Sequence, residues 1–172
     1  PVVIFGHAIL TERRMLLALG DALARKGYAA VAIDLPYHGT RTICWTDGPL
    51  SIPDPTTGKL TPLGNPCSQS GHCNDQHACV NDAGAEVPLA TWPVIPMPTA
   101  SGAAFLEMEH IANTRDHFVQ AEIDLSALLR SLREGDWSTV FTRPVDTSKI
   151  FYAGQSLGGI LGATFVGTHP EI

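Results

Sequence analysis

Apolar residues in this chain occur in short continuous runs and in longer stretches with a helical period. The first run, residues 2–5, is rich in β-branched side chains and predicts a strand inside a parallel sheet. A second run, residues 30–33, predicts a similar strand that ends at Asp34. A third run, residues 149–153, predicts a short buried strand late in the chain. The pattern therefore indicates strands with apolar surroundings on both faces.

Helical periodicity fills two of the intervals between these runs. Thr11 is the predicted N-cap of the first helix, and Gly27 ends it. The apolar face of this helix consists of Met15, Leu16, Leu19 and Leu23. A second helix is predicted to begin with Asn113 as its cap and Asp116 in its first turn, and to end at Gly135. Its apolar stripe consists of Phe118, Ala121, Leu125, Leu128, Leu129 and Leu132.

The order of these elements predicts one α/β domain over residues 1–172, in which the strands are parallel. Residues 42–100 form an insertion within it that shows no periodicity and contains nine of the thirteen prolines and all four cysteines. The insertion leaves the carboxyl end of a strand, where open α/β sheets bind ligands. It is either a lid or substrate-binding cap, or a surface excursion without a role in binding.

Composition narrows the class of protein. The chain has 172 residues, of which 44% are hydrophobic and 16% are charged, as expected for a globular domain with its own core. A net charge of -6 and the absence of a basic run give no electrostatic reason to bind nucleic acid. No apolar segment reaches the length of a membrane span. The chain opens directly on an apolar run without a signal peptide, and we expect it to be a piece of a longer protein.

All four cysteines lie in the insertion. An even number of cysteines in a loop-rich region predicts two disulfides and an oxidising compartment. The cysteines are Cys44, Cys67, Cys73 and Cys79. Their pairing does not follow from the sequence. His72 and His77 lie among them, so a zinc site is the alternative, but the usual Cys-x-x-Cys spacing is absent. We expect no metal and no cofactor.

Residues 154–159 carry the candidate chemistry. Their sequence, Gly-Gln-Ser-Leu-Gly-Gly, lies between the third apolar run and residues 160–166, which predict a buried helix. A strand, Gly-x-Ser-x-Gly and a helix together form a nucleophile elbow, in which Ser156 would be the catalytic nucleophile. Gly154 and Gly158 are needed there because a Cβ would crowd the strand or the helix. The alternative is a glycine-rich turn with an incidental serine.

An acyl-transfer site also needs donors for the oxyanion, a base and an acid. The N–H of Leu157 is the first predicted donor, and the loop after the first strand supplies the second, for which we predict the N–H of Ile9 with Ala8 as the neighbouring option. His7 is interpreted as shaping that loop. After Ser156 the only candidates for the base and the acid are His169 and Glu171. Both lie near the far end of the helix, too far from Ser156, so the base and acid are expected outside this segment.

Residues 3–10, 32–39 and 154–159 resemble the α/β-hydrolase superfamily, and residues 115–125 look like the large bacterial extracellular lipases and esterases. The resemblance covers roughly the first 41 and the last 70 residues. It implies a partial α/β-hydrolase fold whose visible strands lie in the order second, first, third, with the third strand exposed as a hydrophobic edge. Ala8 departs from the family, whose oxyanion loop has a glycine there.

These observations favour a secreted or periplasmic carboxylic ester hydrolase, of the lipase, esterase or polyesterase type, that forms an acyl-enzyme at Ser156. Its expected partners are a small-molecule, lipid or polymeric ester and the remainder of the hydrolase domain, with no nucleic acid. One alternative is an acyltransferase or thioesterase of the same fold. Another is a catalytically inactive hydrolase-like binding module.

Overall fold

The structure is a computed structural model, and the description below concerns the residues that it places. These residues are 1–42, 51–53, 60–62, 67, 72–74, 76, 78–87, 101–108, 110–141 and 143–172. The helices are α1 (Leu17–Arg25), α2 (Ile111–Glu134) and α3 (Leu157–Thr168), with 3₁₀ turns at Arg13–Leu16, Gly39–Arg41 and Ala103–Phe105. The strands are β1 (Val2–Gly6), β2 (Ala29–Val31), β3 (Ser51–Pro53), β4 (Leu60–Pro62), β5 (His72–Cys73), β6 (Cys79–Val80) and β7 (Ile150–Gly154).

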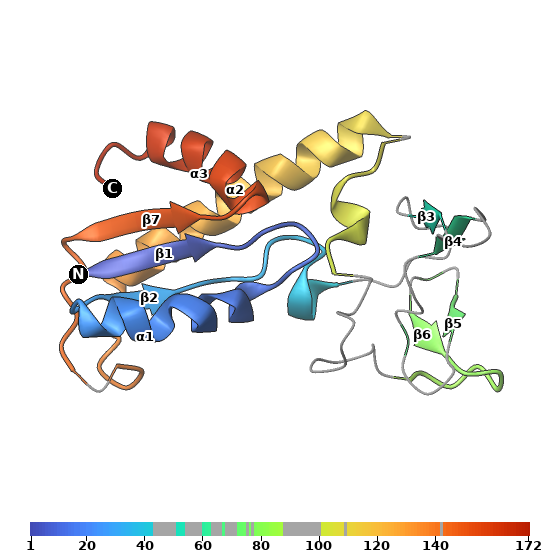
Figure 1. Cartoon of the computed structure of the whole chain (residues 1–172), viewed down its shortest axis with the longest axis horizontal. Coiled ribbons are helices and arrows are strands. Elements are labelled where there is room, and N and C mark those ends of the chain that lie inside the picture. The colour runs from blue at the N-terminus through green and yellow to red at the C-terminus, as the bar shows by residue number, and fades with distance from the viewer. Residues whose placement is uncertain are drawn as a thin grey trace.

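The main sheet contains β1, β2 and β7, all parallel, in the order β2-β1-β7 (Figure 1). The parallel strands and this spatial order were both predicted, and the structure confirms them. β1 pairs with β7 along its whole length, from Val2 opposite Ile150 to Gly6 opposite Gly154. The segments that follow these two strands therefore begin side by side at the carboxyl edge of the sheet.

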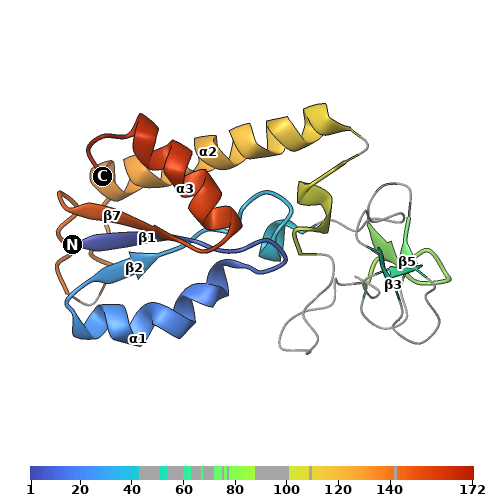
Figure 2. The same ribbon diagram turned by 45° about the horizontal axis from the view of Figure 1, so that its top comes forward.

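Helices cover both faces of this sheet, α1 on one side and α2 and α3 on the other (Figure 2). The apolar stripe predicted for α2 is confirmed: Ala121, Leu125, Leu129 and Leu132 are buried, and Phe118 and Leu128 pack against them. The same core contains Val2, Ile4, Ile150, Leu161 and Phe165 from the strands and α3. The fold is thus a small mixed α/β arrangement with one main core.

Two predicted helix starts are wrong, because hydrogen bonds to residues that precede the helices use the side chains that would have capped them. The Thr11 hydroxyl donates to Ala8 O at 2.6 Å, and the helical segment begins later, at a 3₁₀ turn whose N-cap is Glu12. Asn113 lies inside α2, which begins at Ile111, and its amide donates to a Glu107 carboxylate oxygen at 2.8 Å.

The predicted ends of these helices are confirmed. Gly27 has φ +81, and the N–H of Tyr28 donates back to Leu23 O at 3.0 Å, as in a Schellman motif. Gly135 follows the last residue of α2. On the predicted apolar face of α1, however, Leu19 remains 43% exposed.

The second strand is shorter than its apolar run. Its ladder with β1 stops at Val31 opposite Ile4, and the chain then leads to the buried side chain of Asp34. On the side away from β1, β7 pairs with no further strand among the described residues, and Phe151 is 46% exposed. Ile160 on the neighbouring α3 is 63% exposed. This apolar border agrees with the expected hydrophobic edge.

Within the insertion, β3 pairs with β4 and β5 with β6, each pair antiparallel. A disulfide joins Cys67 to Cys79. The predicted zinc alternative would need these thiolates as ligands, and the disulfide removes both from such a site. Cys44 and His77 lie outside the described residues. Among the helices that are described, none combines the length and apolar character needed to cross a membrane.

Candidate active site

Ser156 holds an unusual backbone conformation at the junction of β7 and α3, with φ 50 and ψ -114, as the N-cap of α3. Within the described part of the chain only two other non-glycine residues have positive φ, Leu10 and Tyr37. Each of the three lies in the segment that follows one of the main strands. The strained positions therefore gather at the carboxyl edge of the sheet, where ligands of open α/β sheets bind.

The glycines on either side of Ser156 are required by close backbone packing, as the sequence predicts. A Cβ on Gly154 would overlap the carbonyl of Gly158, and a Cβ on Gly158 would overlap the carbonyl of Gly6. By contrast, a Cβ on Gly159 would lie 3.6 Å from the nearest atom, Gly154 O, which is an ordinary contact. The turn brings α3 against β1 and β7 more closely than any side chain would allow.

Backbone hydrogen bonds join this turn to the loop that follows β1. The N–H of Gln155 donates to Gly6 O at 3.0 Å, and the N–H of Gly158 donates to His7 O at 3.0 Å. The Tyr152 hydroxyl donates to Gly158 O at 2.7 Å, and burial, with the Glu122 charge, raises the pKa of Tyr152 to about 12. The Ser156 turn and the β1 loop are therefore one hydrogen-bonded unit.

Ser156 is exposed, and its hydroxyl makes no hydrogen bond to any residue that the structure describes. The backbone N–H groups of Leu157 and Ile9 likewise donate to no described residue. Leu157 opens α3, whose N-terminus favours nearby negative charge. The roles of Leu157 and Ile9 as oxyanion donors stay predictions.

His7 is fully buried and bridges two loops, in agreement with its interpretation as a loop-shaping residue. The N–H of Leu35 donates to His7 Nε2 at 3.1 Å, so the ring proton must lie on Nδ1, which donates to Ala8 O at 2.9 Å. Desolvation by burial lowers the pKa of His7 below its ordinary value, against the opposing effect of the bond to Ala8. The ring is therefore neutral and fixed in one tautomer.

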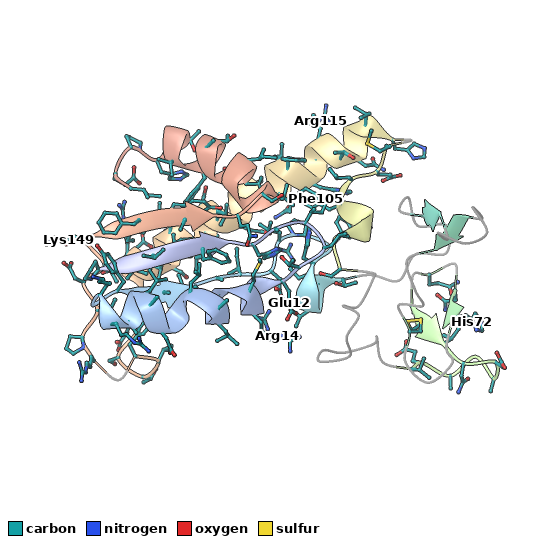
Figure 3. All side chains as sticks on the ribbon, in the orientation of Figure 1. Glu12, Arg14, His72, Phe105, Arg115 and Lys149 are labelled. Carbon is teal, nitrogen blue, oxygen red and sulfur yellow. A yellow bond between two sulfur atoms is a disulfide. The ribbon has the colours of Figure 1, made fainter. Side chains whose placement is uncertain are left out.

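His38 is also fully buried, and no feature of the sequence indicated this. Its Nδ1 donates to Pro36 O at 2.7 Å, and its Nε2 has no hydrogen-bond partner among the described groups. Burial, the largest cause, lowers the pKa of His38 to about 4. Its ring lies 4.8 Å from that of His7 and 5.3 Å from that of Phe105, between centroids (Figure 3 labels Phe105).

Asp34 anchors the loops around these histidines. It accepts hydrogen bonds from the N–H groups of Arg13 at 2.8 Å and Thr40 at 3.0 Å, and it pairs with the Arg13 guanidinium at 2.5 Å. Burial alone would raise the pKa of Asp34, but these hydrogen bonds and the charge of Arg13 outweigh it and lower the pKa below the ordinary value. The sequence marked Asp34 only as the end of a strand, because its partners are distant in the chain.

Ser101 and Gly102 return the chain from the insertion to the same edge of the sheet. The buried Ser101 hydroxyl donates to Thr11 O at 2.6 Å and accepts from the N–H of Gly39 at 3.1 Å. The N–H of Gly102 donates to Tyr37 O at 2.7 Å. The end of the insertion is thereby bonded to the loops after β1 and β2. No sequence signal marked Ser101, because its partners are brought to it only by the fold.

The remaining histidines are not brought to Ser156. His169 follows α3, so the length of that helix, about 18 Å at 1.5 Å per residue, separates it from Ser156, as predicted. His110 contacts Glu107 at 2.6 Å, and His117 contacts Phe105 O at 2.9 Å. His72 is exposed, and its Nδ1 lies 3.8 Å from Asp82. In the described part of the chain, none of these side chains hydrogen-bonds with the serine.

No family model, curated protein or solved structure matches this chain. The class that the structure itself defines is a mixed α/β fold built on a three-stranded parallel sheet with helices on both faces. Its candidate site is the strained serine between β7 and α3.

Proposed function

We propose that this chain is the nucleophile-bearing segment of a serine hydrolase that acts on carboxylic esters, with Ser156 as the nucleophile. The observation that carries the proposal is the backbone of Ser156, at φ 50 and ψ -114 between two glycines that no other residue can replace without overlap. A non-glycine residue in such a conformation costs about 1–3 kcal/mol and clusters at functional sites. A serine without a role would only destabilise this position, where glycine fits without strain.

The surroundings of the hydroxyl suit nucleophilic attack. Ser156 is exposed, its hydroxyl has no competing partner among the described residues, and it stands at the N-terminus of a 12-residue helix. Negative charge that develops next to this helix start is stabilised by the free N–H groups and the helix dipole. This favours acyl transfer through a tetrahedral intermediate over a role in binding alone.

In the proposed reaction, Ser156 Oγ attacks the ester carbonyl carbon while a histidine outside residues 1–172 takes the hydroxyl proton. The carbonyl oxygen becomes an oxyanion, which the N–H groups of Leu157 and Ile9 stabilise. The carbon–oxygen bond to the alcohol then breaks, and the histidine returns the proton to the leaving alcohol. Water then attacks the carbonyl carbon of the acyl-enzyme while the histidine takes its proton. The carbon–oxygen bond to Ser156 breaks, the histidine returns the proton to Ser156 Oγ, and the acid is released. An Asp or Glu, also outside this segment, orients the histidine.

The proposal includes a secreted or periplasmic location, which the Cys67–Cys79 disulfide supports because such bonds persist in oxidising compartments. The substrate class is a small-molecule, lipid or polymeric ester. The proposal requires no cofactor, because the serine itself supplies the nucleophile.

Labelling with a fluorophosphonate probe tests the proposal on the full natural protein that contains these residues. The expected result is one probe per chain on the peptide that carries Ser156, with no label in Ser156→Ala. Ser138→Ala is the control, because Ser138 is an exposed serine outside the candidate site. Absence of label, or label that persists in Ser156→Ala, contradicts the proposal. Paired p-nitrophenyl ester and thioester substrates then establish which leaving group the labelled protein prefers.

A further inference from the structure

The carbonyl of Ala8 accepts three hydrogen bonds from residues in the loop that follows β1. It accepts from His7 Nδ1 at 2.9 Å, from the Thr11 hydroxyl at 2.6 Å and from the Thr11 N–H at 3.3 Å. His7 is fully buried and Thr11 is partly buried, so these donors have few alternative partners. The orientation of the Ala8–Ile9 peptide is therefore fixed from the carbonyl side.

The donor character of His7 Nδ1 is itself fixed by the fold. The N–H of Leu35 can only donate, and it donates to His7 Nε2, so that nitrogen must be the unprotonated one. The neutral ring then carries its single proton on Nδ1, facing the Ala8 carbonyl. The segment after β2 thus selects the tautomer that holds the segment after β1.

Peptide geometry converts this pinning into a direction for the neighbouring N–H groups. In a planar trans peptide the C=O and N–H point in opposite directions. The Ile9 N–H therefore points away from His7 Nδ1 and Thr11, and it is left without a described partner. The preceding peptide has the reverse orientation: His7 O accepts from the Gly158 N–H, so the Ala8 N–H points away from the start of α3.

We infer that His7 and Thr11 are positioning residues that fix the Ala8–Ile9 peptide so that the Ile9 N–H, and not the Ala8 N–H, is the second oxyanion donor; this inference rests on the proposed ester hydrolysis at Ser156. A glycine at position 8 would leave this peptide free to change its orientation, whereas Ala8 with the hydrogen bonds from His7 and Thr11 holds it in one orientation. With Ala8, the peptide is oriented by its neighbours and does not have to rearrange when the oxyanion forms, which is the condition for effective transition-state stabilisation.

Two variants of His7 separate the two hydrogen bonds of its ring. In His7→Asn the side-chain amide occupies the place of Nδ1 and keeps the donor to Ala8 O, whereas in His7→Gln it occupies the place of Nε2 and keeps the contact with Leu35. The test measures kcat and KM for p-nitrophenyl butyrate with the full natural protein. We expect His7→Gln to lose at least tenfold in kcat at unchanged KM, and His7→Asn to recover most of it.

Thr11 provides a second pair that does not depend on the fold tolerating a change at His7. Thr11→Val removes the hydroxyl at constant shape and is expected to lower kcat at least tenfold at unchanged KM, while Thr11→Ser keeps the donor and recovers kcat. Equal kcat in the two members of either pair overturns the inference, as does a His7 pair in which activity follows the Leu35 contact. These outcomes in a protein that is labelled at Ser156 leave the proposed function standing. Absence of that label overturns both.

Discussion

Ser156 has a backbone conformation with positive φ, which is sterically unfavourable for an L-amino acid that carries a Cβ. Reversing the signs of its φ 50 and ψ -114 would give an ordinary extended residue, so the observed conformation is comfortable only for glycine, which has no handedness. The serine is therefore kept at the expense of stability. This cost supports the proposed role of the serine independently of the motif in which it lies.

Two substitutions at Ser156 measure this strain. Both Ser156→Gly and Ser156→Ala remove the hydroxyl, but only glycine relieves the backbone. We expect Ser156→Gly to be more stable than Ser156→Ala by about 1 kcal/mol in the free energy of unfolding, although glycine is ordinarily the less stable of the two in regular structure. Urea denaturation of the two variants makes the comparison. Equal stability, or an advantage for alanine, would show that the position is not strained.

At the candidate site, the residues that could be identified from the sequence are those that form a short local pattern with their neighbours in the chain. Gly154, Ser156 and Gly158 form a local pattern, and the structure confirms the crowding that was expected around both glycines. The burial of His38 and the contacts of Ser101 were missed, because their partners come from segments far along the chain. No local preference signals such contacts.

At the level of elements, α3 is placed by contacts between backbones. Its Gly158 lies against the carbonyl of Gly6, and Tyr152 of β7 bonds to the Gly158 carbonyl. The sequence predicted this helix and its glycines correctly, but it also predicted a buried helix, whereas Ile160 is 63% exposed. It predicted the starts of the other two helices wrongly, because Thr11 and Asn113 are good caps locally but are used by Ala8 and Glu107 in the fold.

Adjacent glycines at the start of α3 offer a matched pair of alanine substitutions. Gly158→Ala places a Cβ on the Gly6 carbonyl, and we expect a loss of at least about 3 kcal/mol, comparable with severe core overpacking. Gly159→Ala meets only an ordinary contact at 3.6 Å and gains helix propensity, so its stability should change by less than about 1 kcal/mol. Thermal and urea unfolding of both variants test the difference. Similar losses would argue against the close approach of α3 to β1.

On the scale of the whole molecule, the loops after β1 and β2 meet in a buried polar cluster of His7, His38 and Asp34. Its hydrogen bonds join segments that the sheet alone does not connect, from Arg13 to Thr40. The parallel strands were predictable from the apolar runs and the rules of βαβ connection, and their order was implied by the family resemblance of residues 3–10, 32–39 and 154–159. This cluster was not, since it depends on the burial of charges and rings that sequence patterns assign to the surface.

Acid should unfold the molecule through this cluster. The pKa of His38 in the folded protein is about 4, below the ordinary value of about 6.5 in the unfolded chain, so the unfolded state binds more protons between these values. The resulting stability is complete above pH 6.5 and is lost as the pH falls to about 4, by roughly 3 kcal/mol. The lowered pKa of His7 acts in the same direction, and that of Asp34 adds a loss at still lower pH.

Urea midpoints at pH 7 and pH 5 test this expectation with two variants. His38→Asn should reduce the difference in stability between the two pH values, because it removes the buried ring that must be protonated on unfolding. His72→Asn is the matched control, since His72 is exposed and lies outside the buried cluster, and the pH difference in His38→Asn is compared with the one in this variant. A full pH difference in His38→Asn would exclude His38 as its source.

The Tyr37 carbonyl accepts hydrogen bonds from residues at both ends of the insertion, where the chain leaves the main fold and where it returns. The Thr42 hydroxyl donates to it at 3.4 Å and the Gly102 N–H at 2.7 Å. Two segments that reach the same oxygen atom can be joined by almost any length of polypeptide without moving the strands, and the entropy of a longer connection grows only slowly. The insertion can therefore be replaced by a segment of different length or sequence without displacing the main sheet or Ser156.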